Sequence, residues 1–376
     1  MKINYKFFTI FVLLATLICI IYYNYNKEGF IYYPSSWGSY RVPSLPAVRT
    51  LPAVRSWPSI ASAGGSGVSI SNDGPVTITF VNKQEIADYG YDGNTTYNLD
   101  INIQTIPQYV ITAQKIRHFT GSLTIGNTVQ TIGYRAFYYS LFTGSLTLGD
   151  SVKTIGAEAF KGCSGFNGEL IIGNGVIRIG YMAFNGCSGF TGSLTIGNKV
   201  QIIDEFAFND CSGFTGNLTI PNSVTGIRNG AFGGCSRFTG NLTIPNSVTD
   251  LGNGTFQECL GFNGSLTLSN IMTSIGNSIF KNCSGFTGSL TIPNSVNSID
   301  EEAFKNCSGF NGELIIGNGV TRIGRQAFSN CSGFNGELIV GNGVISIGSQ
   351  AFSGTNFSKA IVQKADQETM VNSPLN

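Results

Sequence analysis

Charged residues and histidine are scarce in this chain. Only 11% of its 376 residues are charged, against roughly 25% in a typical soluble domain. The formal net charge is +1, which argues against a nucleic-acid partner, because such proteins carry a basic face. The single histidine, His118, argues against a histidine-based hydrolase or metal site. We therefore expect no catalytic residues, no metal, no cofactor and no nucleic acid, and interpret the chain as a binding protein, not an enzyme.

One long hydrophobic run stands at the N-terminus. Residues 7–23 read FFTIFVLLATLICIIYY without a charge, which is near the shortest length that spans a bilayer as a helix. Because Lys2 and Lys6 precede the run, we expect residues 1–6 to be a cytoplasmic tip and residues 24–376 to lie on the outer surface of a cell or virion. A cleaved signal peptide is the alternative, but the run ends in bulky residues where small ones are needed. We expect a single-pass transmembrane signal-anchor.

Residues 24–67 differ in composition from the rest of the chain. They contain a tandem step, LPAVRT followed by LPAVRS, and five prolines that favour extended polyproline backbone. Residues 62–67 offer a flexible joint. We interpret this segment as a proline-rich stalk or linker. A docking motif for an SH3-type module is the alternative, but such modules act in the cytoplasm.

The dominant feature of the chain is a repeat of 24 residues. Phenylalanine, cysteine and leucine all recur with this period, except for a first step of 23 residues. Repeats of this length are typical of solenoids, in which a single coil cannot bury its apolar side chains without its neighbours. The recurring leucines are Leu123, Leu146, Leu170, Leu194, Leu218, Leu242, Leu266, Leu290, Leu314 and Leu338.

Each repeat can be converted to local structure. Residues 285–308 read GFTGSLTIPNSVNSIDEEAFKNCS. The alternation of polar and apolar residues over 289–292 predicts a short strand, and the Pro-Asn-Ser sequence that follows predicts a turn. Asp300 stands where a helix N-cap is favoured, and Phe304 and Cys307 then share one face of a helical turn. The unit therefore predicts a strand, a turn and one helical turn.

These steps, I-P-N-S-V, I-G/D-x-x-A-F and the following Cys, resemble the BspA-type leucine-rich repeat family over about residues 101–357. The resemblance implies a leucine-rich repeat solenoid, a right-handed coil of about ten repeats with a parallel β ladder. It also implies a surface or secreted protein that acts in adhesion and partner binding. The unit is one residue longer than the commoner one in this family, and we interpret the extra glycine before the strand as a bulge.

The segment before the regular array is expected to close its first edge. Residues 68–118 predict an N-terminal β cap, because residues 76–80 alternate as a strand does. Residues 101–118 are interpreted as a degenerate, shortened repeat. In this interpretation, residues 106–110 copy the I-P-N-S-V step.

The regular leucine-rich repeats are expected to occupy residues 119–357. After Phe352 the pattern lapses, and residues 358–376 predict a C-terminal cap or tail. Residues 358–371 are expected to form one polar helix over this end.

The outward positions of the predicted strands form the expected binding face, since the sheet of a solenoid is its usual contact surface. This face is neutral and rich in hydroxyls and amides, with an acidic C-terminal end. It lacks the aromatic anchors of a binding hot spot, and its threonines also suit a merely solvated sheet. The candidate ligand-binding residues are Glu169, Thr195, Asn217, Thr219, Asn241, Thr243, Thr267, Thr291, Glu313 and Glu337.

The partner is expected to be a protein or glycan ligand on another surface, bound in adhesion or recognition. The alternative is a structural spacer or coat component that self-associates. Membrane attachment is expected through residues 7–23. Among the glycosylation sequons, Asn94 in a polar Tyr-Asp-Gly-Asn-Thr-Thr stretch is the best candidate.

The repeat cysteines admit three interpretations: free buried thiols, disulfides between coils, or a metal array. Translated copies point in the same direction, whereas a disulfide needs two Cβ atoms that face each other. Metal sites need paired cysteines or clustered histidines, and neither occurs. We therefore expect a ladder of free, buried thiols.

Overall fold

The computed structural model describes residues 68–69, 76–80, 97–101, 105–106, 121–364 and 367–371. The chain divides into the units Met1–Ala61 and Ser62–Asn376, and every described residue belongs to the second. The predicted signal-anchor, the stalk and Asn94 lie outside the described residues. Within the described part of the chain, no helix is long and apolar enough to cross a membrane.

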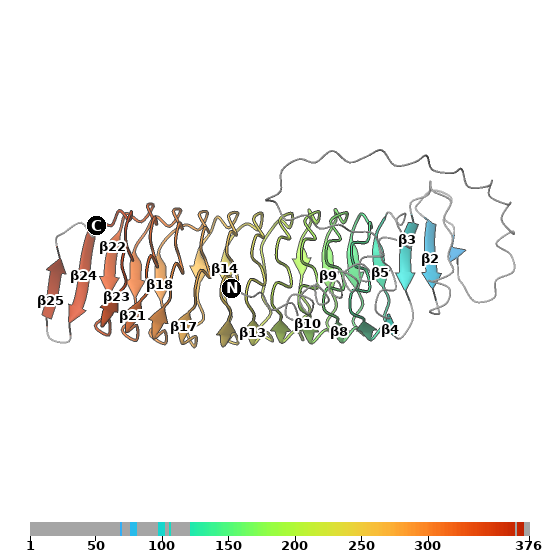
Figure 1. Ribbon diagram of the computed structural model, residues 1–376, viewed down its shortest axis with the longest axis horizontal. Coiled ribbons are helices and arrows are strands. Elements are labelled where there is room, and N and C mark those ends of the chain that lie inside the picture. Colours follow the sequence, from blue (N-terminus) through green and yellow to red (C-terminus); the bar gives the residue numbers. More distant parts are fainter. Residues whose placement is uncertain are drawn as a thin grey trace, which may run out of the picture. The chain divides into compact units, whose positions relative to one another are not determined.

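Two ladders of short strands run along the stacked coils (Figure 1). Nearly all pairings are parallel, and each residue pairs with its own copy one repeat away, as Leu290 does with Leu314. The predicted parallel β-solenoid is confirmed, and the second ladder adds a side that the sequence interpretation lacked. The first ladder contains β1 (Val68–Ser69), β2 (Val76–Phe80), β3 (Tyr97–Ile101), β5 (Leu123–Ile125), β7 (Leu146–Leu148), β9 (Leu170–Ile172), β11 (Leu194–Thr195), β14 (Leu242–Thr243), β16 (Leu266–Thr267), β18 (Leu290–Ile292), β20 (Leu314–Ile316), β22 (Glu337–Val340), β24 (Lys359–Lys364) and β25 (Gln367–Val371). The second ladder contains β4 (Thr105–Ile106), β6 (Thr131–Ile132), β8 (Thr154–Ile155), β10 (Arg178–Ile179), β12 (Ile202–Ile203), β13 (Gly226–Ile227), β15 (Asp250–Leu251), β17 (Ser274–Ile275), β19 (Ser298–Ile299), β21 (Arg322–Ile323) and β23 (Ser346–Ile347).

The third side of each coil consists of turns, so the predicted helical turn is wrong. Glu302 and Asn306 have left-handed backbone, with φ of 56° and 62°, and a left-handed residue every fourth position prevents an α-helix. The backbone groups bond to the next coil instead: the N–H of Phe304 donates to the carbonyl of Ala327 at 2.7 Å. We call this side, residues 300–307 and their equivalents in the other coils, the turn face.

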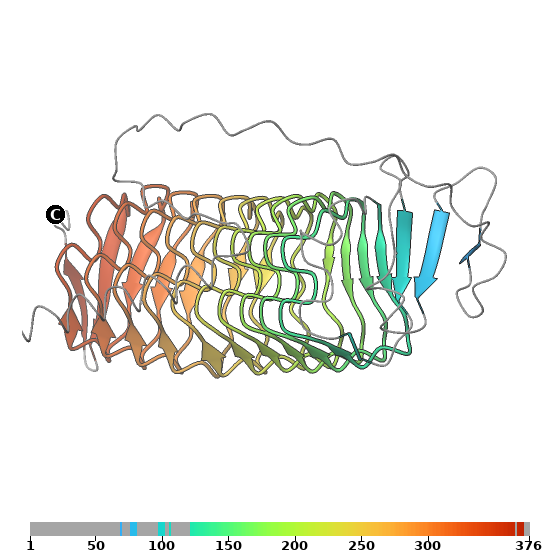
Figure 2. The same ribbon diagram turned by 45° about the vertical axis from the view of Figure 1, so that its right-hand side comes forward.

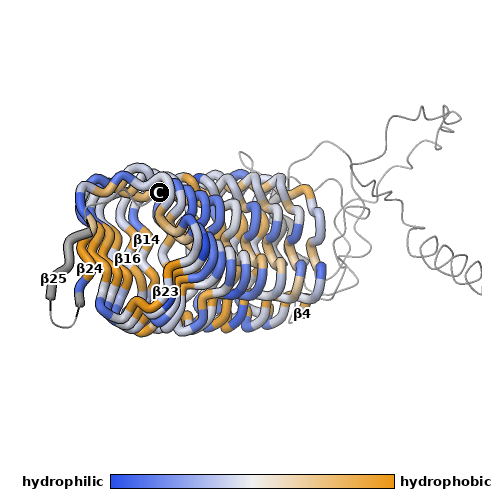
Figure 3. The backbone as a smooth tube through the Cα atoms, turned by 60° about the vertical axis from the view of Figure 1, so that its left-hand side comes forward, coloured by the Kyte–Doolittle hydropathy of each residue, from blue (hydrophilic) through white to orange (hydrophobic). Residues whose placement is uncertain are grey.

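The core is a set of side-chain ladders that fill the space between the three sides. Leucine, isoleucine, valine, alanine, phenylalanine and cysteine each stack on their own copies and are almost completely buried. The rings of Phe160 and Phe184 are nearly parallel, with centroids 5.1 Å apart, and the second phenylalanine of each coil stacks similarly, as Phe286 does on Phe310. Positions of like hydropathy consequently form stripes along the stack (Figure 3).

The first ladder is interrupted at three coil interfaces, and each interruption coincides with a proline. Within the described coils, strand pairing is missing at the interfaces that precede Pro221, Pro245 and Pro293. At three paired interfaces the same position donates an N–H to a carbonyl of the preceding coil: Gly149 to Ile125, Gly317 to Ile292 and Gly341 to Ile316, at 2.8–3.0 Å. Proline has no N–H to donate, which explains why the ladder opens there.

A row of asparagines beside the first ladder follows the same pattern. The Oδ1 atom of Asn294 accepts the backbone N–H of Asn318 at 2.8 Å, and Asn318 accepts the N–H of Asn342 at 3.1 Å. Among the described coils, the equivalent bonds are missing at the three proline interfaces. On the turn face, in contrast, every described coil from Phe137 onward is bonded to the next. The N–H of the phenylalanine equivalent to Phe304 donates to a carbonyl of the following coil at 2.7–2.9 Å.

Both ends of the array differ from the sequence prediction. Leu99 pairs with Leu123 and Ile106 pairs with Ile132. The stretch around Ile106 is therefore the second-ladder strand of a coil that begins near Leu99, not a copy of the I-P-N-S-V step. The strand predicted at residues 76–80 is confirmed: it is β2, which comes before that coil and pairs in parallel with β3.

The predicted C-terminal polar helix is wrong. Residues 359–371 form the antiparallel hairpin β24–β25, and β24 pairs in parallel with β22. In Lys359–Lys364, KAIVQK, Ala360 and Val362 pack against the core, as a period of two requires of a strand that extends the first ladder. Figures 1 and 2 show the hairpin at the C-terminal end of the stack.

Candidate binding surfaces

The outward side chains of the first ladder form an open face, which we call the strand face. Of the ten predicted ligand-binding residues, nine are exposed and Glu337 is half-buried. They lie on successive coils, and the strands leave the inward leucines buried. The structure thus brings the ten residues into one row along the stack, as the period requires.

Part of this row holds the coils together. Asn241 accepts the backbone N–H of Ser265 through Oδ1 at 2.8 Å, and Ser289 accepts that of Glu313 through Oγ at 3.0 Å. Glu337 lies 3.9 Å from the Lys359 amine, across the pairing of β22 and β24. Ser145 accepts the N–H of Glu169 in the same way at 3.2 Å, so these hydroxyl and amide groups have a structural role towards both ends of the face.

The segment of residues 217–220, which we call the central rung, is different. Its backbone makes no hydrogen bond to either neighbouring coil in the described structure, and the side chains of Asn217 and Thr219 are exposed. Ile196 and Ile220 are 8% and 6% exposed, against 1% for Ile172. The two proline interfaces therefore leave unpaired polar backbone in the middle of the strand face, where water or a ligand can bond to it.

The repeat cysteines lie inside the coils as free thiols, which confirms the prediction. Each Sγ donates to a phenylalanine carbonyl, as that of Cys283 does to Phe256 at 2.9 Å. The thiol is therefore fully buried and has a hydrogen-bond partner. Burial raises the pKa of Cys283 to about 12. A thiol with this pKa is a poor nucleophile near neutral pH. Its role is to pack and to bond the backbone.

The described residues offer no cluster of three or more histidine, cysteine, aspartate or glutamate side chains that could hold a metal ion. The ionisable side chains form pairs between coils instead. Arg178 and Asp204 make a two-point contact, with distances of 2.5 and 2.7 Å. Such pairs stabilise neighbouring coils and present no reactive group.

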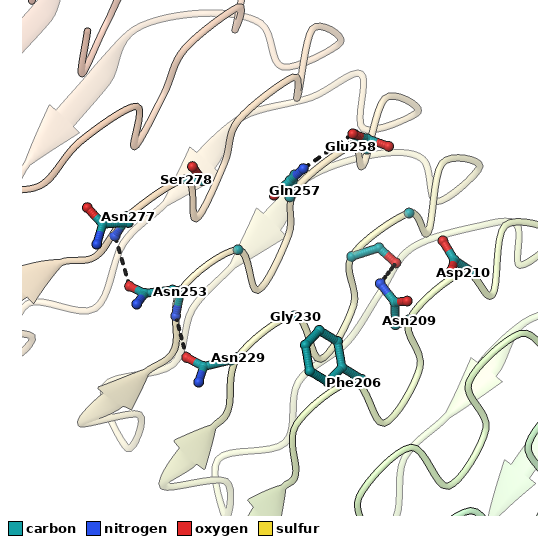
Figure 4. A pocket seen from close by; sticks show the side chains of 13 residues that line it. Phe206, Asn209, Asp210, Asn229, Gly230, Asn253, Gln257, Glu258, Asn277 and Ser278 are labelled. Atoms are coloured by element: carbon teal, nitrogen blue, oxygen red, sulfur yellow. Dashed lines mark hydrogen bonds between the residues drawn. The ribbon is translucent and has the colours of Figure 1, made fainter. Parts of the chain in front are cut away.

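The turn face carries a surface that the sequence interpretation missed. Near the C-terminal half it is covered by Glu302, whose carboxylate contacts the amines of Lys281 and Lys305 at 2.7 and 2.6 Å. In the middle of the stack these long side chains are absent, and a hollow of 390 Å³ lies over four coils (Figure 4). Its signal in the sequence is the RNGAFGGCS stretch of residues 228–236, where glycine replaces larger residues of the other repeats.

A sequence profile of the BspA type leucine rich repeat region matches residues 77–167, 130–263 and 263–372. These matches together span well over half of the chain. The chain therefore belongs to the BspA type leucine-rich repeat family, as the resemblance indicates. No curated protein matches it.

One solved leucine-rich repeat structure has a similar fold. A leucine-rich repeat protein from Bacteroides ovatus is 18% identical, with a TM-score of 0.53 over 79% of this chain and 92% of its own. A leucine rich cell surface protein from Faecalibacterium prausnitzii is 20% identical, with a TM-score of 0.42 over 81% of this chain and 96% of its own. The pneumococcal vaccine antigen PcpA is 13% identical, with a TM-score of 0.42 over 79% of both chains. At such identities the likeness concerns the fold alone.

Proposed function

We propose that this chain is a surface protein that recognises a protein or glycan on another surface through its strand face. Family membership and the exposure of the face support the proposal. The observation that carries it is the central rung, where exposed Asn217 and Thr219 lie beside backbone groups that bond no neighbouring coil. A polar partner can bond to all of these groups, and contacts at the centre of an interface are the best shielded from water.

A pair of charge substitutions tests this proposal. Thr219→Lys together with Thr243→Lys places two amines on neighbouring coils of the strand face. Binding of the full-length chain to an array of extracellular proteins and glycans is measured by surface plasmon resonance. We expect at least a tenfold loss of affinity, because two added ammonium groups must be desolvated at the contact.

The matched control is Thr225→Lys together with Thr249→Lys. These threonines are exposed on adjoining coils, next to the second ladder. The control should bind like the unaltered chain. If both double variants bind equally well, or only the control loses binding, the strand face is not the recognition surface.

We further propose that residues 7–23 anchor the chain in a membrane in a single pass, with residues 24–376 on the outer surface. Carbonate extraction followed by N-terminal sequencing tests this. An intact N-terminus in the membrane fraction supports the anchor. A mature chain that begins near Asn24 means a secreted protein instead.

Self-association in a coat is the second candidate function, and one observation favours it. Ile345 is 85% exposed and Ile347, in β23, is 54% exposed, at the end of the second ladder. An uncovered apolar strand end is a pairing surface for another chain. Light scattering of the detergent-solubilised full-length chain decides the point. A defined oligomer that Ile345→Lys and Ile347→Lys dissolve supports the coat, and a monomer excludes it.

A further inference from the structure

The hollow on the turn face is produced by glycines at positions that hold side chains elsewhere. Gly230, Gly233 and Gly234 stand on one coil, and Gly254 follows on the next. The equivalents of Gly233 in neighbouring coils are Asn209 and Gln257. Four coils therefore present a recess, and Figure 4 shows the side chains that line it.

The backbone does not require glycine at Gly233. Its φ lies outside the left-handed region, and the nearest atom to a Cβ there would be the side-chain Nδ2 of Asn209 at 2.8 Å, with backbone oxygens no closer than 3.4 Å. Even the left-handed positions accept side chains in other coils, as Gln326 and Gln350 show. Gly233 consequently creates space that the backbone itself does not require.

An aromatic ring forms one wall of the hollow. Phe206 is half-buried, and its ring lies against Gly230, where a Cβ would come within 2.6 Å of Cδ1 and Cε1. Tyr181 meets the ring edge-on, with centroids 6.5 Å apart. A half-exposed ring held in this way offers a flat apolar surface, on which the C–H groups of a sugar ring can pack.

Amides line one side of the hollow as a row of three asparagines (Figure 4). Asn229 accepts the backbone N–H of Asn253 at 2.8 Å, and Asn253 accepts that of Asn277 at 2.9 Å. These bonds use Oδ1 and fix the orientation of each amide. In the described structure the Nδ2 groups of Asn253 and Asn277 have no acceptor, so they can donate to a ligand.

Two carboxylates lie on the coils before and after the coil that contains Gly234. Asp210 and Glu258 are exposed and occupy equivalent positions on the two coils that flank Gly234. Partial burial and the charge of Glu258 raise the pKa of Asp210. No lysine or arginine lines the hollow. Two carboxylates without a lining cation disfavour an anionic ligand and can accept hydrogen bonds from hydroxyl groups.

We propose that this hollow is a binding site for a neutral oligosaccharide, separate from the strand face. Phe206 stacks on one sugar ring, the free amide donors of Asn253 and Asn277 bond to ring hydroxyl oxygens, and the carboxylates of Asp210 and Glu258 accept hydroxyl protons. The volume of 390 Å³ lies in the range of small-molecule sites, roughly 300–1,000 Å³.

The test uses the full-length chain and a panel of neutral oligosaccharides: maltotetraose, cellotetraose, mannotriose and chitotriose, with sialyllactose as the anionic comparison. Saturation-transfer NMR detects binding, and calorimetry measures its affinity. Gly233→Gln fills the hollow with the residue that stands at 257, and Phe206→Gln replaces the ring with the residue that stands at 326. The control Ser353→Gln places the same glutamine at the equivalent position of a coil outside the hollow.

We expect at least one neutral oligosaccharide to bind, with at least a tenfold loss in both hollow variants and no change in Ser353→Gln. Urea unfolding of each variant shows whether the fold is retained, and Phe206→Gln keeps the test decisive if Gly233→Gln is unstable. The proposal is overturned if no neutral oligosaccharide binds at millimolar concentration, if only sialyllactose binds, or if both folded hollow variants bind like the unaltered chain.

Discussion

The interruption of the first ladder at Pro221 can be repaired by a single substitution, Pro221→Gly. The paired interfaces show what should form. Gly317 donates to the carbonyl of Ile292 at 3.0 Å, and the next residue donates to the asparagine Oδ1 of the preceding coil at 2.8 Å. In the variant, the new N–H at position 221 should donate to the carbonyl of Ile196 in the same way.

Closing this interface should also recruit the amides of Leu194 and Ile196. The equivalent amides Leu242 and Ile244 donate to the next coil at 3.0 and 2.9 Å. Each new hydrogen bond contributes about 1 kcal/mol net, so the amide exchange of Leu194 should slow by roughly tenfold or more. The global unfolding free energy should rise by about 1–3 kcal/mol, because three or more new hydrogen bonds of about 1 kcal/mol each outweigh the unfolded-chain entropy that glycine adds back.

Hydrogen–deuterium exchange with residue-level readout is the assay. Pro245→Gly is the matched control, because it closes the next interface and should protect Leu218 and Ile220 while leaving Leu194 fast. Two results would refute this explanation of the open ladder. One is slow exchange of Leu194 in the unaltered chain. The other is unchanged exchange of Leu194 in Pro221→Gly, or of Leu218 and Ile220 in Pro245→Gly.

Three further outcomes follow from the core and the charges. Cys283 should resist maleimide at neutral pH in the folded chain and react after denaturation without reductant; early labelling would contradict its burial. Phe232→Ala should cost about 3–5 kcal/mol of unfolding free energy, clearly more than Phe352→Ala at the end of the stack, and equal costs in urea titrations would contradict the stacked core. Lysine contacts lower the pKa of Glu302 from 4.5 to about 2, so its stabilisation is present above pH 4.5 and is lost as pH falls towards 2. Glu302→Gln should remove about 1 kcal/mol at pH 7 and nothing near pH 2, as acid-dependent urea titrations can show.

The core could be predicted from the sequence because the period fixes it. A side chain that recurs every 24 residues must stack on its own copy, and this was enough to identify the buried leucine, phenylalanine and cysteine ladders. The free thiols followed from geometry, since translated copies cannot face each other.

The turn face could not be predicted as readily, because its spacing imitates a helix. The positions of Ala303, Phe304 and Cys307 fit one helical face, yet Glu302 and Asn306 adopt left-handed backbone. The glycines and asparagines that recur at the position of Asn306 were the available signal, since these residues tolerate that conformation best. The hollow was missed because it depends on a difference between repeats, whereas a periodic pattern reveals only what the repeats share.

Whether the strand face is the recognition surface is tested most directly by measuring which backbone amides a bound partner protects from exchange. Hydrogen–deuterium exchange of the full-length chain is measured alone and in complex with a protein or glycan that binds it in the array of extracellular proteins and glycans. We predict slower exchange at residues 217–220 and 241–244 in the complex, because the free backbone groups of the central rung become bonded or covered. Protection confined to the second ladder or to the turn face, with residues 217–220 unchanged, would contradict this role of the strand face.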